Sequence, residues 1–254
     1  MTATVSAYII TKNEEHNIAR AIESVLWMDE IIVLDSGSSD DTRKIAKSYG
    51  ATVSLLDFPG FAEQKNRAMS LCTSDWLFNL DADEEVTPEL RQSIERVLAA
   101  NDVSEDCYEI TRKNHYLGRW MLHSGWYPEY RARLSFTGKA EWKGGAIHES
   151  LQGNGESGCL SGDLLHRPYA NLGEHINTIG RYTKIWAERE NAKGRAFKWS
   201  DLIFRPPFRF LKMFVLKRGF LDGGQGLIAA VMGSFYVFMK YARLYEIQKQ
   251  PKVL

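Results

Sequence analysis

The chain has 254 residues, of which 44 % are apolar and 25 % charged, as is usual for a soluble globular protein of one large domain or a domain with an appendage. Its net charge of zero hides an asymmetry, because residues 1–100 carry 17 acidic and 9 basic side chains, whereas residues 181–218 carry 3 acidic and 11 basic ones. The acidic part suits a metal site, and the basic segment suits a polyanionic surface.

Cysteine usage and the chain ends argue against several classes of protein. The three cysteines lie far apart without a C-x-x-C pair, so a disulfide scaffold and a zinc site are not expected, and a reducing cytosol is the default. Residues 1–5 lack the basic start and apolar stretch of a secretory signal. The longest uncharged apolar run, Gly226–Met239, is shorter than the roughly 20 residues of a spanning helix, so we expect no transmembrane segment.

Strands and helices are predicted to alternate through the first 100 residues. Apolar runs predict buried strands, helical spacing of apolar residues predicts the helices between them, and Thr87 with Pro88 predicts the start of a further helix. This alternation indicates βαβ units with a mostly parallel sheet, hence an α/β fold. The predicted strands are Val5–Ile10, Glu30–Asp35, Thr52–Leu55 and Trp76–Leu80, and the predicted helices include Asp40–Tyr49 and Phe61–Leu71.

An acidic cluster, Asp81-Ala82-Asp83-Glu84, directly follows the fourth predicted strand. Ligands of open α/β sheets bind at this carboxyl edge, and carboxylates there suit Mg²⁺ or Mn²⁺ shared with a diphosphate. Glu84 and Glu85 are interpreted more simply, as charges that complement the following helix N-terminus. No G-x-G-x-x-G and no P-loop follows the first strand, which argues against a dinucleotide-binding enzyme and a nucleotidyltransferase.

Four motifs in order, Ile9–Glu15, Val33–Asp40, Gln64–Ala68 and Leu80–Glu84, resemble those of the family 2 inverting glycosyltransferases, which have the GT-A fold. Two further segments, Trp142–Glu149 and Arg218–Gly223, make the chain most similar to the lipopolysaccharide inner-core β-1,4-glucosyltransferases. The resemblance implies a Rossmann-like GT-A sheet with a C-terminal helical extension, a UDP-sugar donor and a divalent metal.

The resemblance also implies roles for particular residues. Asp35 would accept a hydrogen bond from the uracil ring, although a single Asp taken by itself more often caps a helix. Lys65, or less favourably Arg67, would face the base or diphosphate, and Asp83 would ligate the metal. The remaining predicted donor-site residues are Thr11, Asn13 and Glu14 at the nucleotide pocket and Asp81 near the ribose or metal.

Inversion needs a base for the acceptor hydroxyl, and Glu149 is favoured over Glu141 because it follows two glycines. His148 is a candidate metal ligand beside it, although a histidine in a turn is more often a plain hydrogen-bonding residue. Arg131 and Arg133 alternate along a predicted strand, so they point to one side and could both contact phosphate.

The domains are predicted as a catalytic domain over residues 1–170, with a nucleotide-sugar half at 1–100 and an acceptor half at 101–170, and a basic amphipathic helical region over 171–254. Cations beside aromatic residues in this last region favour an anionic membrane surface over an ordinary solvated helix. No nucleic-acid-binding motif accompanies them. We therefore expect a cytoplasmic protein, peripheral on the inner face of the membrane.

The sequence thus predicts a metal-dependent inverting glycosyltransferase that moves a hexose, glucose from UDP-glucose, onto a lipopolysaccharide inner-core heptose. Another surface glycan or a polyprenyl phosphate stays open as the acceptor, and so does a non-catalytic scaffold that binds a sugar nucleotide. The transferred sugar, the choice between Mg²⁺ and Mn²⁺, and the oligomeric state are left open as well.

Overall fold

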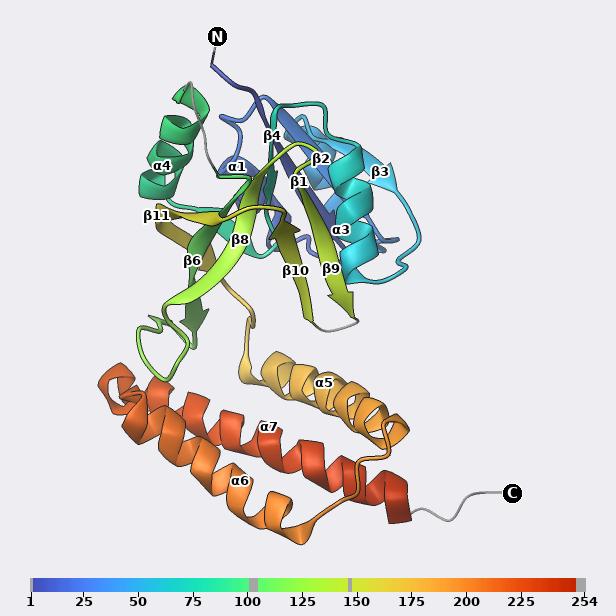
Figure 1. The fold of residues 1–254 in the computed structure, drawn as a ribbon, viewed down its shortest axis with the longest axis vertical. Helices are drawn as coiled ribbons and strands as arrows, with labels where there is room; N and C mark the ends of the chain where they lie inside the picture. Colours follow the sequence, from blue (N-terminus) through green and yellow to red (C-terminus); the bar gives the residue numbers. More distant parts are fainter. Residues whose placement is uncertain (1, 101–104, 146–147, 250–254) are drawn as a thin grey trace. The chain divides into compact units, whose positions relative to one another are not determined.

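The computed structural model of the chain describes residues 2–100, 105–145 and 148–249. It contains two compact units (Figure 1). The first unit comprises Met1–Lys113 and Glu129–His166, and the second comprises Asn114–Pro128 and Arg167–Leu254. Residues 114–128 thus group with the C-terminal helices, whereas the predicted boundary at residue 170 assigned them to the catalytic domain. As functional divisions, the predicted domains stay a prediction.

The first unit begins with the four predicted parallel strands. They lie in the order β3-β2-β1-β4, and the apolar runs of β1, β2 and β4 are almost entirely buried, as expected of strands covered on both faces. The predicted α/β fold is confirmed. The bounds are β1 Val5–Thr11, α1 Ile18–Glu23, β2 Glu30–Asp35, α2 Thr42–Ser48, β3 Thr52–Leu55, α3 Phe61–Ser70 and β4 Trp76–Asn79.

The second half of the sheet is antiparallel. Beyond β4 the strand order continues β8-β6-β11-β5, and a separate two-stranded ribbon pairs β9 with β10. The Thr87 side chain accepts a hydrogen bond from Leu90 N at the start of α4, which confirms the predicted cap. The bounds are β5 Glu84–Val86, α4 Pro88–Ala99, β6 Cys107–Tyr116, β8 Glu129–Phe136, β9 Ala140–Gly145, β10 His148–Gly153 and β11 Ser157–His166.

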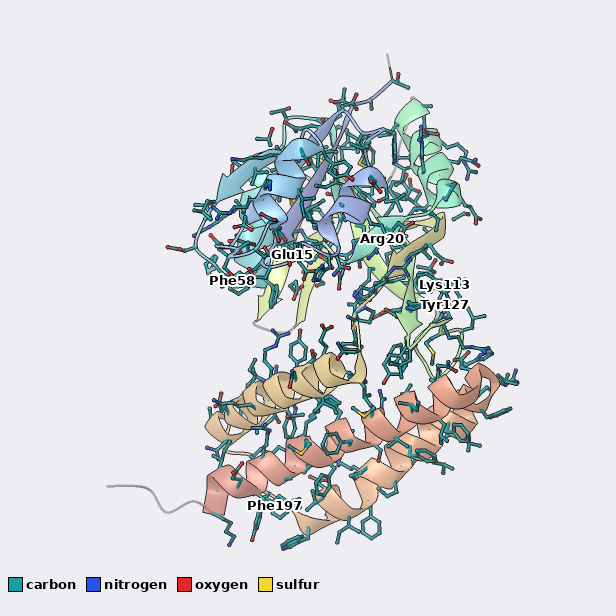
Figure 2. All side chains as sticks on the ribbon, turned by 180° about the vertical axis from the view of Figure 1, so that it is seen from behind. Glu15, Arg20, Phe58, Lys113, Tyr127 and Phe197 are labelled. Carbon is teal, nitrogen blue, oxygen red and sulfur yellow. The ribbon has the colours of Figure 1, made fainter. Side chains whose placement is uncertain are left out.

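The second unit is mainly helical. Its short strand β7, Arg119–Trp120, pairs with the last residues of β6, and α7 packs against both α5 and α6. Trp186 of α5 meets Tyr241 of α7 edge to face with ring centroids 5.3 Å apart, and Phe197, before α6, packs on the same cluster (Figure 2). The bounds are α5 Leu172–Ala192, α6 Trp199–Leu211, the π-helix η1 Lys212–Leu216, the 3-10 helix η2 Gly219–Asp222 and α7 Gly223–Lys249.

The last helix differs from the sequence expectation. The segment Gly219–Lys249 is 31 residues long, and its most apolar 18-residue window has a mean hydropathy of 1.3, so by length and composition it could cross a membrane. The expectation of no such segment counted only the uncharged run, whereas the helix continues beyond it. A core helix of a soluble protein can have the same length and composition, so the finding does not establish a span.

Candidate active site

The predicted donor-site residues meet at the carboxyl edge of the parallel strands. Thr11 at the end of β1 is the register partner of Asp35 at the end of β2, and Tyr8 of β1 is the partner of Asn79 of β4. The chain leaves β1 toward β2 on one side and returns through β4 on the other. The order therefore reverses between β1 and β4, and ligands of open α/β sheets bind at such a switch point.

The turns after β1 and β2 are bound to each other by side chains. Asn13, at a left-handed φ of 56°, accepts from Ser39 N at 2.8 Å through Oδ1, and Asn13 N donates to Ser38 Oγ at 2.9 Å. Glu14 N donates to Thr42 Oγ1, and Asp41 N, in the turn after β2, donates to Glu15. The polar Thr11–Glu15 segment thus forms a fixed rim rather than a loose loop.

Asp35 and Thr11 occupy this rim in different ways. Asp35 is fully buried, and its carboxylate accepts from Gly37 N at 3.0 Å, Ser38 N at 2.8 Å and the Ser38 hydroxyl. These bonds close the turn after β2 and cap no helix, because α2 begins at Thr42 with Asp41 at its N-cap, so the predicted capping role of Asp35 is wrong. The Thr11 hydroxyl is also buried, but it has no hydrogen-bond partner among the described residues. Because buried polar groups are nearly always paired, this hydroxyl is the rim atom best suited to meet a ligand.

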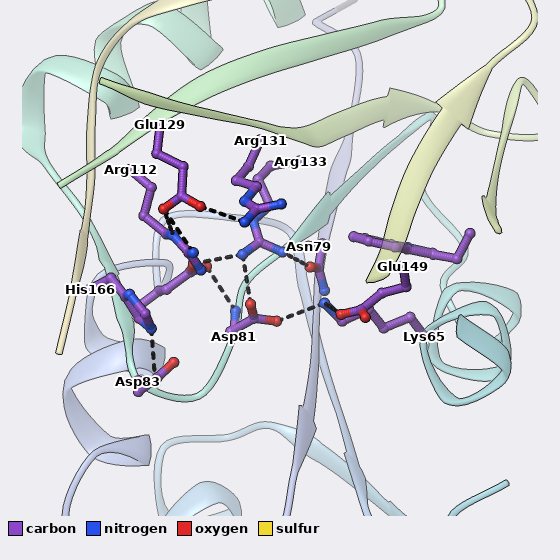
Figure 3. A network of polar contacts seen from close by, with 12 residues as sticks. Lys65, Asn79, Asp81, Asp83, Arg112, Glu129, Arg131, Arg133, Glu149 and His166 are labelled. Atoms are coloured by element: carbon purple, nitrogen blue, oxygen red, sulfur yellow. Dashed lines mark hydrogen bonds and ion pairs between the residues drawn. The ribbon is translucent and has the colours of Figure 1, made fainter. Parts of the chain in front are cut away.

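Lys65 and Arg133 hold Asp81 between them (Figure 3). Lys65 Nζ lies 3.0 Å from Asp81 Oδ1, and an Arg133 terminal nitrogen lies 2.6 Å from Oδ2. Burial alone would raise the pKa of Asp81, but the two cations outweigh it and hold that pKa well below its ordinary value. Asp81 is therefore ionised, and both of its oxygens are engaged by cations.

Arg133 extends this network of ion pairs from Asp81 to further side chains of the first unit. It also binds Glu84 at 2.6 Å and Asn79, and Arg112 bridges Glu84 at 3.5 Å to Glu129 at 2.9 Å. Burial would lower the pKa of Arg133, but Asp81 and Glu84 raise it instead. The sequence interpretation of Glu84 as a helix-end charge is wrong, because Glu84 is a fully buried residue of β5 that binds two arginines.

Arg133 and Arg131 have unequal surroundings although both lie on β8. The Arg133 side chain is 3 % exposed and both of its terminal nitrogens are paired, although its buried Nε has no partner among the described residues, whereas Arg131 is 45 % exposed and pairs with Glu129. Of the two, Arg131 is the cation open to solvent. Phosphate contacts for either arginine stay a prediction.

The β9–β10 ribbon brings the favoured base candidate to the same lysine. Lys65 Nζ donates to Glu149 Oε1 at 3.4 Å and stands 4.3 Å from the centroid of the Trp142 ring. Glu149 is 19 % exposed, whereas Glu141 is 65 % exposed and pairs with Lys143. Lys65 thus joins Asp81 to Glu149, whereas Glu141 pairs with Lys143 away from this lysine.

Asn66, next to Lys65 on α3, fastens the ribbon. Its side-chain amide donates to Trp142 O at 2.9 Å and accepts from Trp142 N at 2.9 Å, as a neighbouring strand would. The Trp142 indole nitrogen donates to the Tyr8 hydroxyl at 2.7 Å. The strand that pairs with Glu149 is therefore held from two sides.

Asp83 lies apart from this cation cluster and contacts His166 at the end of β11. Asp83 Oδ2 and His166 Nε2 are 3.1 Å apart, and both side chains are largely buried but reach solvent. A carboxylate and an imidazole are two donors for a divalent cation, and no group of three such donors occurs in residues 2–100, 105–145 and 148–249. Oxygens of a diphosphate and water would supply the rest, which fits a metal shared with substrate. The side chain of His148, the predicted ligand, lies outside the described residues.

Comparison with known proteins identifies the family. The model of the family described as glycosyl transferase family 2 matches residues 6–153, which is more than half of the chain. The chain belongs to glycosyl transferase family 2. It is 30 % identical over 249 residues to the lipopolysaccharide core biosynthesis glycosyltransferase LpsC of Rhizobium meliloti, covering 95 % of this chain and 92 % of that one. It is 33 % identical over 254 residues to an uncharacterized glycosyltransferase of Rickettsia typhi, covering 96 % and 87 %.

Among solved structures, this family 2 chain is similar to glucosyl-3-phosphoglycerate synthase from Mycobacterium tuberculosis, which was crystallised with Mn²⁺, UDP and glucosyl-3-phosphoglycerate. The identity is 27 %, the match covers 46 % of this chain and 45 % of that one, and the TM-score is 0.35. A likeness this partial carries no argument about the present site.

Sequence reasoning missed four residues of the network: Asn79, Arg112, Glu129 and His166. Arg112 and Glu129 lie on antiparallel strands whose pairing is long-range, so their contact had no local signal. His166 comes 83 residues after Asp83. The pairing of β11 with β5, in which His166 is the register partner of Glu84, brings His166 beside Asp83.

Proposed function

We propose that this family 2 enzyme is an inverting, metal-dependent glycosyltransferase that moves glucose from UDP-glucose onto a lipopolysaccharide inner-core heptose. The observation that carries the proposal is Lys65, whose Nζ lies between a donor-side carboxylate, Asp81, and an acceptor-side carboxylate, Glu149. A single displacement needs these two sides within reach of each other. The similarity to LpsC supports the acceptor class.

In this mechanism the Glu149 carboxylate takes the proton of the acceptor hydroxyl while the hydroxyl oxygen attacks the anomeric carbon. The bond from that carbon to the diphosphate breaks, and its electron pair leaves with UDP. Lys65 holds the base by its 3.4 Å contact, and Asn66 fixes the ribbon behind it. Asp83 and His166 would hold Mg²⁺ or Mn²⁺, which when bound would neutralise charge on the departing diphosphate.

On the nucleotide side, the unpaired Thr11 hydroxyl is proposed to meet the nucleotide, with Asn13 and Glu14 shaping the rim. Asp35 would accept from uracil through Oδ2, because two of the three turn donors reach Oδ1 and only the Ser38 hydroxyl reaches Oδ2, which leaves this oxygen a second lone pair. The rim would then position the base while the cluster at Asp81 faces the sugar diphosphate.

We also propose that the enzyme works in the cytoplasm at the inner face of the membrane, where a lipid-linked acceptor would be presented. The basic side chains of the second unit, among them Arg209, Lys212, Lys217 and Arg218, would be attracted to anionic lipid. This surplus of cations in residues 181–218 supports the proposal.

The test is a turnover assay with UDP-, GDP- and CMP-sugars, a heptose-containing core acceptor, and Mn²⁺ or Mg²⁺. The wild type is expected to consume UDP-glucose with acceptor and metal, and the product should have the β configuration from the α-linked donor. A scaffold would bind the nucleotide sugar without turnover. Retention of the anomeric configuration, or turnover undiminished in Asp83→Asn with excess EDTA, would contradict the proposal.

A further inference from the structure

The second unit exposes a large apolar surface along α6, η1, η2 and α7. Phe204 is 68 % exposed, Phe208 59 % and Leu216 64 %, although each is a large apolar side chain. Monomeric soluble proteins seldom expose a contiguous surface of this kind unless it has a binding function. Its other members are Trp199, Ile203, Leu211, Val215, Phe220, Leu221, Leu227, Ile228, Val231, Phe235 and Phe238.

The spacing shows that these side chains form stripes rather than scattered exposures. In the α6–η1 segment, exposed apolar residues recur at 204, 208, 211 and 215, and in α7 they recur at 227, 231, 235 and 238. Intervals of three and four place residues on one face of a helix. The opposite faces carry the buried contacts, since Met213 and Ala230 are in one cluster. Each helix thus has one face inside the unit and one apolar face outside it.

Cations predominate beside the stripes, and the one acidic side chain at the start of α6, Asp201, is paired with Arg195 and Arg205. Arg205, Arg209 and Lys212 follow the α6 stripe one residue later, so they form a row next to it. Between residues 202 and 245 the only acidic side chain is Asp222, which is fully buried and accepts from Leu122 N and His123 N. No carboxylate is therefore exposed along this stretch, which is described throughout.

We infer that this surface, defined as the exposed apolar side chains of Trp199–Phe238, inserts into the headgroup and acyl boundary of an anionic bilayer. The inference goes beyond the proposed attraction by charge, because burial of the apolar side chains would then hold the protein on the membrane. Helices with apolar stripes flanked by lysine and arginine lie in this plane and penetrate to the acyl boundary.

Charge argues for lipid over a second copy of the chain. Pairing two copies through this face would bring rows of cations together, and the carboxylates of residues 199–238 would not compensate, because Asp201 is already paired with Arg195 and Arg205 and Asp222 is fully buried. An anionic lipid surface supplies the missing negative charge and also the apolar medium. An anionic bilayer therefore matches both the positive charge and the apolar character of the face, whereas a second copy matches only its apolar character.

The two modes of binding differ in their response to salt. At 1 M salt the Debye length falls to about 3 Å, so attraction of charges to the headgroups is screened, whereas apolar burial persists. The experiment is flotation of the full chain with vesicles of phosphatidylcholine and phosphatidylglycerol at 0.1 and 1 M NaCl. The wild type is expected to float at both concentrations.

Two variants and a control separate the contributions. The triple variant Phe204→Ser, Phe208→Ser, Leu216→Ser is expected to lose at least 10-fold in vesicle partitioning. The charge variant Arg209→Gln, Lys212→Gln, Lys217→Gln, Arg218→Gln is expected to keep salt-resistant binding with a smaller loss. The control Leu26→Ser, Leu71→Ser removes exposed apolar side chains of the first unit and should float like the wild type.

Three results would overturn the inference: release of the wild type by 1 M NaCl, undiminished flotation of the triple variant, or a concentration-dependent dimer that does not float. Melting temperatures with and without UDP-glucose are measured on the same samples. A triple variant that no longer floats but still binds the donor localises the loss to the apolar face. Flotation measures membrane binding and the melting temperature measures donor binding, so failure of the membrane inference can be distinguished from failure of the proposed function.

Discussion

Arg133 in the first unit and Arg209 in the second show how differently the two units use a cation. Arg133 is buried between Asp81 and Glu84, and both of its terminal nitrogens are paired with side chains of the first unit. Arg209 is exposed, lies beside an apolar stripe, and has no carboxylate on α6–α7 within reach of solvent between residues 202 and 245. In the first unit charged side chains pair with one another and so fix the geometry of the site. In the second unit exposed cations remain available to a partner.

Apolar side chains follow the reverse distribution. In the first unit the large ones fill the core around β1 and β4, among them Tyr8, Trp76 and Phe78. In the second unit large aromatic and aliphatic side chains stay at the surface. A unit that recognises a nucleotide sugar needs a rigid polar cluster, whereas a unit that meets a lipid phase needs exposed apolar area. Single substitutions in each unit can show whether this difference is functional.

The largest expected effect is that of the base. Glu149→Gln keeps the size of the side chain but cannot take a proton, so we expect kcat to fall by roughly 10²- to 10⁴-fold. Glu141→Gln, at an exposed position on the neighbouring strand, should change kcat less than twofold. Steady-state turnover of UDP-glucose with acceptor measures both. Equal losses in the two variants, or a loss only in Glu141→Gln, would remove Glu149 from the mechanism.

The next largest effect is expected from removing a buried charge. Arg133→Met leaves Asp81 and Glu84 without their shared cation, and breaking a buried pair in this way costs about 3–5 kcal/mol of unfolding free energy. Arg131→Met, two residues earlier on β8, should cost no more than about 1 kcal/mol because its ion pair is exposed. Urea unfolding compares the two. Similar losses of unfolding free energy in the two variants would show that the buried ion pairs of Arg133 stabilise the fold no more than the exposed pair of Arg131.

A pH effect distinguishes the second unit. Burial lowers the pKa of His175 to about 4, and its Nδ1 lies 2.9 Å from the Tyr116 hydroxyl. The unfolded chain takes up this proton near pH 6.5, before the folded chain does, so stability should fall as pH drops from about 6.5 to about 4 by about 2–3 kcal/mol. His175→Gln should flatten melting temperature against pH in that window. An unchanged profile in the variant would assign the acid sensitivity elsewhere.

The smallest effect concerns the ribbon. Asn66→Ala removes both hydrogen bonds to the Trp142 backbone and should cost about 1–2 kcal/mol, with faster hydrogen exchange at the Trp142 amide. Asn66→Asp keeps the acceptor for Trp142 N and should retain protection at that amide. If exchange is the same in both variants and the wild type, the side chain of Asn66 does not fix the ribbon.

The sequence predicted the parallel half of the sheet because its signals are local. The strand Glu30–Asp35 has the predicted bounds, and the motif residues Thr11, Asp35 and Asp81 follow strands whose ends meet in any parallel sheet. The antiparallel half depends on long-range pairing, so neither the Arg112–Glu129 contact nor the partner of Asp83 could be read from spacing. Arg131 and Arg133 could not be told apart from the sequence, because alternation along a strand shows which face a side chain points to but not how deeply it is buried.

The most direct test of the account is the melting temperature of the wild type and of Asp83→Ala with UDP-, GDP-, CMP- and dTDP-sugars, with and without Mn²⁺. A donor at 100 times its Kd stabilises by about 2.7 kcal/mol, which raises the melting temperature by several degrees. The account predicts such a rise for one UDP-sugar, only with Mn²⁺, and its loss in Asp83→Ala relative to that variant's own ligand-free value. No rise with any sugar nucleotide, or an equal rise in the variant, would contradict a donor site organised around Asp83.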